Sequence, residues 1–467
     1  MQSAKVIFLT DMISDNEKES PLAFTDVKGT VSYLPDEELI REGIVEVFRR
    51  NFKLYGFNPV ETPILDFYEV GANKYGGGAE ILKETYRLRD NGGRELILRY
   101  ELTFKLAKLL AMNPNTKLPF KRYEIGKAFR DGPLKLGRFR EFTQMDVDTI
   151  GSKDMFAEAE LIDMTAKAFK ELDLDVYIEL NSRKLLYGLF ESVNLCEESF
   201  VDAALSLDKY KKIGAEEVIE ELLKKEISKD CINSMFGTLN KATEFESEEQ
   251  KIRFIADSAK TPLALEGAKE LEQILEYCKS NANHIVVKIN PTLSRGLSYY
   301  TGPMWEVFLT NSMINCSIAA GGRWDNMITK FIESDKEYPA VGAAFGLDTI
   351  YEAVKEKRAN KVEIKFFCES SPKVLVLPVK QTPILVNAVT TLVSKLRKAG
   401  ISSDLIVDQK LRKSMEYANK NAIPYSIILG ENELSRNAVT FRDMKSGEEI
   451  EIPENELVNK IKSKIAT

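Results

Sequence analysis

The sequence predicts an α+β protein, with a body of strands and helices, a helical insertion within that body, and a separate α/β domain at its C-terminal end. Three observations lead to this prediction. Two alternating segments flank a loop broken by glycine and proline between residues 117 and 150, which is typical of paired strands. Residues 182–280 are rich in leucine, lysine and glutamate at helical spacing. Residues 371–467 alternate between strand and helix patterns, and a chain of 467 residues is long enough for two to four domains.

The first part of the body, residues 25–181, follows a polar lead of residues 1–24. A helix is predicted to begin at Pro35, because proline suits a first helical turn and acidic residues follow it, and Gly56 is a stop signal. Its buried face is predicted from apolar residues at helical spacing, namely Ile40, Ile44, Val47, Phe48 and Phe52. An extended run then leads to Pro63.

The strand pair between residues 117 and 150 has one strongly polar face. Successive side chains of a strand alternate between its two faces. One face of the second strand therefore carries Glu141, Thr143, Met145 and Val147. The other face carries a polar and aromatic set: Arg140, Phe142, Gln144, Asp146 and Asp148. A helix is predicted to follow, from about Met155 to Glu171.

After the insertion of residues 182–280, the second part of the body comprises residues 281–358. Its strand patterns end in PAVGAAFG, which runs directly into the helical pattern LDTIYEAVKEK. Residues 359–370 are predicted to be a linker. In the C-terminal domain, residues 371–467, a β-α-β-α-β alternation precedes two short strands and a last helix.

Composition excludes several classes of function. The single histidine, His284, excludes histidine-rich metal sites, and its neighbourhood beside an apolar strand favours a structural role. The five cysteines contain no C-x-x-C pair, so neither a disulfide framework nor a cysteine zinc site is indicated. No apolar run approaches the roughly 18 residues of a membrane span. The N-terminus lacks the layout of a signal peptide, so we expect a cytoplasmic protein.

The net charge of −7 argues against indiscriminate binding of nucleic acid. Residues 371–467 nevertheless hold 15 lysines and arginines against 11 acidic residues. This excess is compatible with a local phosphate-binding surface and equally with an ordinary solvated one.

Three clusters are candidates for chemistry. Around the 130–140 loop, four cations form the first cluster, and guanidinium groups suit phosphate oxygens; they are Arg130, Lys135, Arg138 and Arg140. An exposed basic hairpin is an equally good interpretation. The second cluster, residues 294–302, places an arginine beside two tyrosines, although such tyrosines often serve packing. The third joins AAGGRW to PAVGAAFGLD, where small residues allow either close approach of a ligand or close sheet packing. Nucleotide motifs of the Rossmann and P-loop types are absent.

These clusters, in this order, resemble the histidyl-tRNA synthetase family of class II aminoacyl-tRNA synthetases, from about Lys28 to the end. The helix and extended run that reach Pro63 are similar to motif 1, the dimerisation element. LRYELTFKLAKLLAMN and KRYEIGKAFRDGPLKLGRFREFTQMDVD are similar to the amino-acid-binding segment and motif 2. RGLSYYTG resembles the histidine-specific signature RGLDYYTG, and AAGGRWD with VGAAFGLDTI resembles the segment reaching motif 3. LDKYKKIGAEEV resembles the helical insertion, and KVLVLPV through SIILGENEL the anticodon-binding domain.

The resemblance implies an antiparallel catalytic sheet, a homodimer, and a histidine–tRNA ligase that uses ATP. The carboxylate of L-histidine would attack the α-phosphate of ATP, and histidine tRNA would then accept the histidyl group at its 3′ end. Mg²⁺ would bridge the ATP phosphates, but the spacing of residues assigns it no ligands.

The resemblance also implies roles for individual residues. Arg130 and Arg295 would be the catalytic pair that grips the α-phosphate and the histidine carboxylate, and Arg138 would bind the γ-phosphate. Histidine would be bound by both catalytic arginines and by residues of three further segments: Glu101, Leu102 and Thr103, then Gln144 and Asp148, then Tyr299 and Tyr300.

The sequence departs from the family pattern at three positions. Ser298 replaces the aspartate of the histidine signature, and Trp324 replaces a tyrosine. Thr349 replaces the arginine of motif 3, which normally helps to hold ATP. Arg323 is therefore assigned to ATP binding as a partial substitute.

Two alternatives follow from these departures. One is a catalytically silent regulatory subunit of ATP phosphoribosyltransferase, a relative that typically lacks the C-terminal domain. The other is a tRNA-binding or sensing module without catalysis, which would be expected to have lost the motif 2 arginines. Both are disfavoured by the retained domain and arginines.

Overall fold

The computed structural model describes residues 25–74, 82–280, 285–295, 299–333, 336–359 and 372–465. The chain forms two units, Met1–Cys368 and Glu369–Thr467, each with its own sheet. His284 and Ser298 lie outside the described residues.

An eight-stranded sheet is the centre of the first unit. Its inner neighbours pair antiparallel, whereas each edge strand pairs parallel with the strand beside it. The predicted α+β class with an antiparallel core is therefore confirmed. In spatial order the strands are β1 (Asn58–Pro59), β5 (Phe120–Phe129), β6 (Glu141–Ile150), β11 (Ala340–Gly346), β10 (Ala319–Arg323), β9 (Pro303–Leu309), β7 (Val176–Ser182) and β8 (Val286–Ile289).

Three helices cover one face of this sheet: α1 (Pro35–Leu54), α5 (Phe156–Glu171) and α13 (Leu347–Ala359). The apolar residues predicted for the first helix are all buried, and the ring of Phe48 lies 4.7 Å from that of Phe345 on β11. Met145 and Val147 of β6 join the same core. This packing leaves the opposite, polar face of β6 for the site described below.

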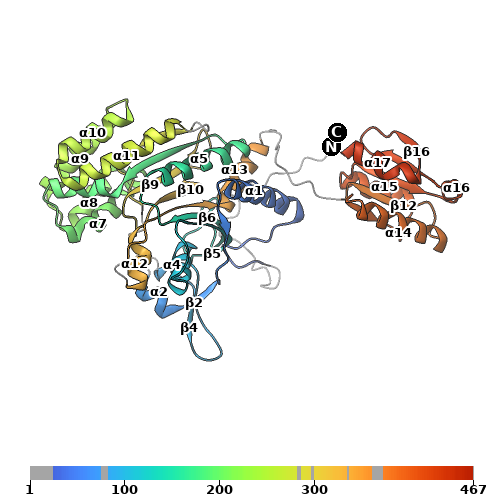
Figure 1. Cartoon of the computed structure of the whole chain (residues 1–467), viewed down its shortest axis with the longest axis horizontal. Coiled ribbons are helices and arrows are strands. Elements are labelled where there is room, and N and C mark those ends of the chain that lie inside the picture. Colours follow the sequence, from blue (N-terminus) through green and yellow to red (C-terminus); the bar gives the residue numbers. More distant parts are fainter. Residues whose placement is uncertain are drawn as a thin grey trace, which may run out of the picture. The chain divides into compact units, whose positions relative to one another are not determined.

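A small sheet of three strands was not predicted from the sequence. It comprises β2 (Leu65–Phe67), β4 (Glu95–Leu98) and β3 (Arg87–Arg89), next to α2 (Tyr68–Lys74). Strands of three or four residues are too short to establish an alternating pattern. Figure 1 shows the β3–β4 hairpin projecting from the body of the unit.

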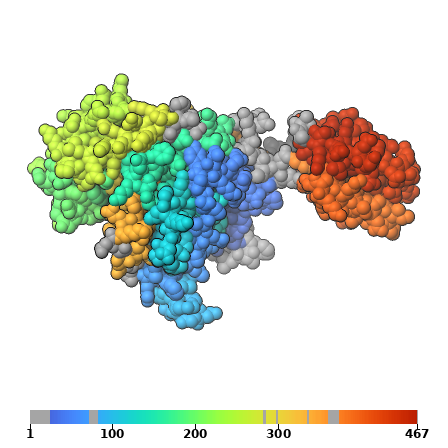
Figure 2. Space-filling model, in the orientation of Figure 1, coloured from blue at the N-terminus to red at the C-terminus, as the bar shows by residue number. Residues whose placement is uncertain are grey.

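The insertion is helical, as the fold prediction states. Its helices form a lobe, green to yellow in Figures 1 and 2, against one end of the central sheet. No helix among the described residues has both the length and the apolar character needed to cross a membrane. The helices of the lobe are α6 (Arg183–Ser192), α7 (Phe200–Leu207), α8 (Tyr210–Lys224), α9 (Lys229–Thr243), α10 (Glu248–Ala259) and α11 (Pro262–Ser280).

The second unit has the predicted α/β alternation. Its five strands lie in the order β13 (Ser403–Leu405), β12 (Val374–Pro378), β14 (Tyr425–Leu429), β15 (Ala438–Asp443) and β16 (Glu449–Pro453). A separate apolar core joins this sheet to α14 (Pro383–Lys398) and α17 (Glu454–Ile465). The remaining helices are α15 (Leu411–Lys420) and α16 (Glu431–Ser435).

A buried ion pair joins α1 to α13 beneath the central sheet. Asp348 accepts hydrogen bonds from Arg41 Nη1 at 2.8 Å, from the backbone N–H of Thr143 at 2.8 Å and from the Tyr33 hydroxyl at 3.1 Å. The side chains of Arg41 and Asp348 are each 3% exposed. Because Asp348 contacts three elements, this carboxylate fixes α13 against β6.

We expect Arg41→Ala to lower the free energy of unfolding by about 3 kcal/mol, since it leaves the Asp348 charge buried without its cation. Arg49→Ala on the same helix removes only an exposed pair with Glu46 and should cost less than about 0.5 kcal/mol. The measurement is urea unfolding followed by tryptophan fluorescence, which reports the first unit because it contains both tryptophans, Trp305 and Trp324. Equal unfolding midpoints for the two variants would refute this assignment.

Candidate functional site

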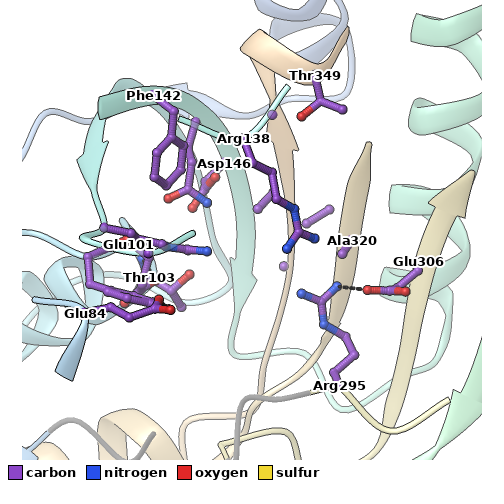
Figure 3. A pocket seen from close by; sticks show the side chains of 18 of the residues that line it. Glu84, Glu101, Thr103, Arg138, Phe142, Asp146, Arg295, Glu306, Ala320 and Thr349 are labelled. Carbon is purple, nitrogen blue, oxygen red and sulfur yellow. Dashed lines mark hydrogen bonds and ion pairs between the residues drawn. The ribbon is translucent and has the colours of Figure 1, made fainter. Parts of the chain in front are cut away.

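A cavity of about 480 Å³ lies over the polar face of β6, on the side of the sheet away from α1. Small residues of β10 and β11 form part of its wall: Ala320, Gly342, Ala343 and Ala344. Figure 3 shows acidic side chains, among them Glu84 and Glu101, on one side of this cavity, with Arg138 and Arg295 on the other. The cavity therefore has an acidic end and a cationic end.

The β6–β11 register makes room for the acidic end. Phe142, Gln144, Asp146 and Asp148 all line the cavity, so the predicted alternation of faces is confirmed. Asp148 lies opposite Gly342, and a Cβ atom at Gly342 would collide with its carboxylate. Glycine is thus required at this position for steric reasons.

Two buried arginines neutralise part of the acidic end. Arg122 Nη2 lies 2.7 Å from Asp148 Oδ2, and its Nη1 lies 3.6 Å from Glu124 Oε2. Arg99 Nη1 lies 2.9 Å from Glu124 Oε1. Glu101 instead accepts backbone N–H groups of Thr103 at 2.6 Å and Phe104 at 2.7 Å, at the start of α4 (Thr103–Met112).

Asp146 lacks an equivalent partner. Its Oδ1 is buried without a hydrogen bond, although the side chain lines the cavity. Burial raises the pKa of Asp146 well above its usual range, with Asp148 and Glu101 adding to the shift. Burial likewise raises the pKa of Asp148 to about 6, although Arg122 opposes the shift. The acidic end thus holds more carboxylates than cations and suits a cationic ligand group.

Arg130 follows β5 and extends its guanidinium along the cavity wall. The group stacks over the rings of Tyr100, at 4.2 Å, and Phe142, at 5.1 Å. Its Nε donates to the Tyr100 carbonyl at 3.2 Å. The contacts with these two rings hold the Arg130 guanidinium in place. None of the described carboxylates forms an ion pair with it.

Arg295 approaches the cavity from the other part of the body, beside the histidine-signature segment. Its Nε and Nη1 are buried without hydrogen bonds, and Nη1 lies 3.5 Å from Glu306 Oε1. Burial opposes its charge, but Tyr300 and Glu306 outweigh that effect and raise its pKa above the usual range. Because neither Nε nor Nη1 donates a hydrogen bond, this buried guanidinium can still bind an anion.

The backbone of Arg295 is in the left-handed region, with φ 57°. Its N–H donates to Asp208 Oδ1 at 2.8 Å, and Arg183 Nη2 donates to its carbonyl at 3.5 Å. Asp208 and Arg183 both belong to the helical insertion, so the insertion fixes the conformation of this arginine.

Aromatic side chains close the acidic end. The rings of Tyr299 and Tyr300 are 4.8 Å apart, and Trp324 donates a side-chain hydrogen bond to Asp148. Trp324 therefore contacts the Asp148 carboxylate directly. Burial raises the pKa of both tyrosines, which keeps their hydroxyl groups protonated.

Two of the assigned residues do not line the cavity. Arg323 is buried and paired with Glu158 at 2.6 and 2.9 Å and with Asp325 at 3.2 Å, so the structure gives it a structural role rather than an ATP contact. Leu102 is fully buried, and its carbonyl accepts from Arg122 at 3.4 Å. Both were assigned by motif position, which does not reveal the direction of a side chain. The other assigned residues line the cavity together: Glu101, Thr103, Arg130, Arg138, Gln144, Asp148, Arg295, Tyr299 and Tyr300.

Several lining residues were not assigned to the site from the sequence, among them Asp146, Asp208 and Lys212. Strand alternation placed Asp146 on the correct face, and that signal was sufficient to include it. Asp208 and Lys212 lie in the helical insertion, whose approach to the cavity depends on tertiary packing and leaves no local pattern.

The chain matches the family model for histidyl-tRNA synthetase over residues 29–350 and that for the anticodon binding domain over residues 373–464. A Bacillus cereus protein named histidine–tRNA ligase 1 is 42% identical over 93% of this chain and 99% of that protein. Histidine–tRNA ligase 2 of Shouchella clausii is 39% identical over 92% of this chain and 98% of that protein.

The solved structures agree with these matches. The histidyl-tRNA synthetase of Nostoc sp. PCC 7120 superimposes with a TM-score of 0.78 at 25% identity, covering 94% of this chain and 99% of that one. A Bacillus halodurans structure described as an ATP phosphoribosyltransferase regulatory subunit/histidyl-tRNA synthetase has a TM-score of 0.70 at 20% identity, covering 88% and 98%. The latter likeness concerns the fold alone. With both family models matched in order and near-complete coverage by relatives, the chain belongs to the histidyl-tRNA synthetase family.

Proposed function

We propose that this chain is a histidine–tRNA ligase whose cavity holds L-histidine at its acidic end and the phosphates of ATP at its cationic end. The observation that carries the proposal is the convergence of Arg130 and Arg295 on one cavity, from parts of the body that the insertion separates. Histidine carries a cationic amino group and a polar ring, which suit the acidic end of the cavity. Its carboxylate suits the cationic end.

The acidic end would select histidine by its polar atoms. We assign the amino group to Glu101, Thr103 and Gln144, and a ring N–H to Asp148. A neutral imidazole offers one donor and one acceptor. A non-polar analogue would leave buried carboxylates unpaired, which is a much larger penalty than a missing methylene group.

The cationic end would promote attack of the histidine carboxylate on the α-phosphate, which forms histidyl-adenylate and releases pyrophosphate. Arg130 and Arg295 would hold the two anions together and stabilise the charge that grows on the phosphoryl oxygens. Arg138 would bind the γ-phosphate. Guanidinium groups suit this step because it needs no proton transfer from the protein.

Mg²⁺ would neutralise ATP phosphate charge when bound. Among the described residues, no three potential ligands of the histidine, cysteine or carboxylate type converge, which fits an ion that arrives on the nucleotide with at most one or two protein ligands. We further propose that the second unit binds histidine tRNA, that the protein acts as a homodimer, and that it works in the cytoplasm.

The regulatory-subunit alternative is not favoured. The curated relatives that match along most of the chain are named as ligases, and the anticodon-binding domain is present. A non-catalytic tRNA-binding module would have no use for a buried guanidinium beside a polar cavity whose Nε and Nη1 donate no hydrogen bond.

Arg295→Ala should reduce histidine-dependent ATP–pyrophosphate exchange by about 100- to 1000-fold, the cost of losing one preorganised charge donor. Arg253→Ala, which removes an exposed arginine of the insertion, should leave exchange unchanged. Circular dichroism of both variants controls for folding. Near-normal exchange by a folded Arg295→Ala protein would disprove the role of this residue.

The KM for histidine should rise as the pH falls below about 6, because Asp148 then gains a proton and stops accepting the ring N–H. The experiment measures KM in the exchange reaction from pH 5 to 8 for the wild type and for Asp148→Asn. Titration of the substrate is common to both proteins, so only the difference between their profiles reports on Asp148. Parallel profiles would exclude Asp148 as the titrating acceptor.

Removal of residues 372–467 should weaken charging of tRNA by at least tenfold while exchange stays within about twofold, because the cavity lies wholly in the first unit. Charging by the full-length protein should also weaken steeply with salt, since phosphate contacts release counterions. Equal loss of charging and exchange would contradict the assignment of tRNA binding to the second unit and of exchange to the first.

A further inference from the structure

The loop between β5 and β6 turns back on itself at residues 133–138, which we call the loop tip. The N–H of Arg138 donates to the Lys135 carbonyl at 2.9 Å, and the N–H of Lys135 donates to the Arg138 carbonyl at 3.3 Å. Gly137 lies between them with φ +70°, a conformation that favours glycine. The loop tip is thus a tight turn that carries two cations, and both line the cavity.

The base of the loop is held by the backbone. The Arg130 N–H donates to the Arg140 carbonyl at 2.8 Å, and the Asp131 N–H donates to the Glu84 carbonyl at 2.7 Å. These bonds fix the base of the loop, and Leu134 of the tip packs against Gly29, where a Cβ atom would lie 2.9 Å from its Cδ2.

Thr349, in the first turn of α13, contacts the loop tip directly. Its hydroxyl donates to the Gly137 carbonyl at 2.9 Å, and the side chain is buried. Among the described residues, this is the one hydrogen bond that joins the loop tip to another element. A Cβ atom at Gly137 would lie 3.0 Å from the Thr349 Cα, so the turn packs against the helix without intervening space.

The contact between Thr349 and Gly137 affects where Arg138 lies in the cavity. In Figure 3, Thr349 lies above Arg138, and the Arg138 guanidinium points toward that of Arg295. A Cβ atom at Gly137 would also lie 3.1 Å from the Thr349 Cγ2 and 3.2 Å from its Oγ1, so the turn packs directly on this side chain. Position 349 therefore contributes a hydrogen bond to a neighbouring loop rather than a charge to the cavity.

We propose that Thr349 is a positioning residue, whose hydroxyl holds the loop tip so that Arg138 and Lys135 face the phosphates of a bound nucleoside triphosphate. The proposal rests on the proposed function, because it assumes that this cavity binds ATP. It assigns to Thr349, through the loop, the support for the nucleotide that the family's motif 3 arginine would supply directly.

The test compares Thr349→Val with Thr349→Ser in the full-length protein. Valine keeps the shape of threonine but loses the hydroxyl, whereas serine keeps the hydroxyl and loses only a methyl group. Limited trypsin digestion without nucleotide, followed by mass spectrometry, measures cleavage after Lys135 and Arg138. Calorimetry with ATP alone then measures the dissociation constant, and thermal unfolding verifies the fold.

We expect Thr349→Val to be cleaved at least threefold faster at the loop tip and to bind ATP about three- to tenfold more weakly, the effect of one lost hydrogen bond. Thr349→Ser should match the wild type in both assays. Unchanged cleavage in Thr349→Val, or equal defects in the valine and serine variants, would overturn the role of the hydroxyl.

Separate results test the positioning role of Thr349 and the proposed function of the cavity. If the wild type binds ATP and the freed loop of Thr349→Val binds it equally well, the positioning role is wrong and the proposed function stands. If the wild type binds no ATP, the proposed function itself is wrong, even where trypsin reports release of the loop tip.

Discussion

The site depends on an electrostatic imbalance in the interior of the protein. Four buried carboxylates, those of Glu101, Glu124, Asp146 and Asp148, are accompanied by the two buried guanidinium groups of Arg99 and Arg122. Burying an unpaired charge is costly, so such a cluster takes up protons or a cationic ligand. The raised pKa values of Asp146 and Asp148 follow from this burial. A ligand with an ammonium group and a polar ring would remove the imbalance.

The same sheet positions both this cluster and the arginines that we propose bind phosphate. Arg130 leaves one end of β5, and Arg295 precedes β9, two strands beyond β11 in the sheet. Because β6, β11 and β10 pair antiparallel with long registers, their positions are fixed by backbone hydrogen bonds rather than by the ligand. The sheet itself thus brings Arg130 and Arg295 to one cavity, which is the condition for electrostatic preorganisation at the proposed site.

Much of this arrangement could be predicted from the sequence. Helical spacing identified the buried face of α1, and alternation identified the polar face of β6, because both signals are local and periodic. Arg323 shows where motif position fails: its chain location suits the cavity, but Glu158 on α5 holds its side chain elsewhere. The contacts of Thr349 with Gly137 and of Asp208 with Arg295 join residues far apart in the chain, so only the folded structure reveals them.

The attachment of Asp208 and Arg183 to the backbone of Arg295 bears on the modularity of the enzyme. A minimal version of the protein could be designed by deleting the lobe of α6 to α11. Excision would, however, remove the acceptor and the donor that keep Arg295, a non-glycine residue that lines the cavity, in a left-handed conformation. The lobe therefore supports the backbone of Arg295 in the cavity. A shortened protein would need a replacement for those two hydrogen bonds.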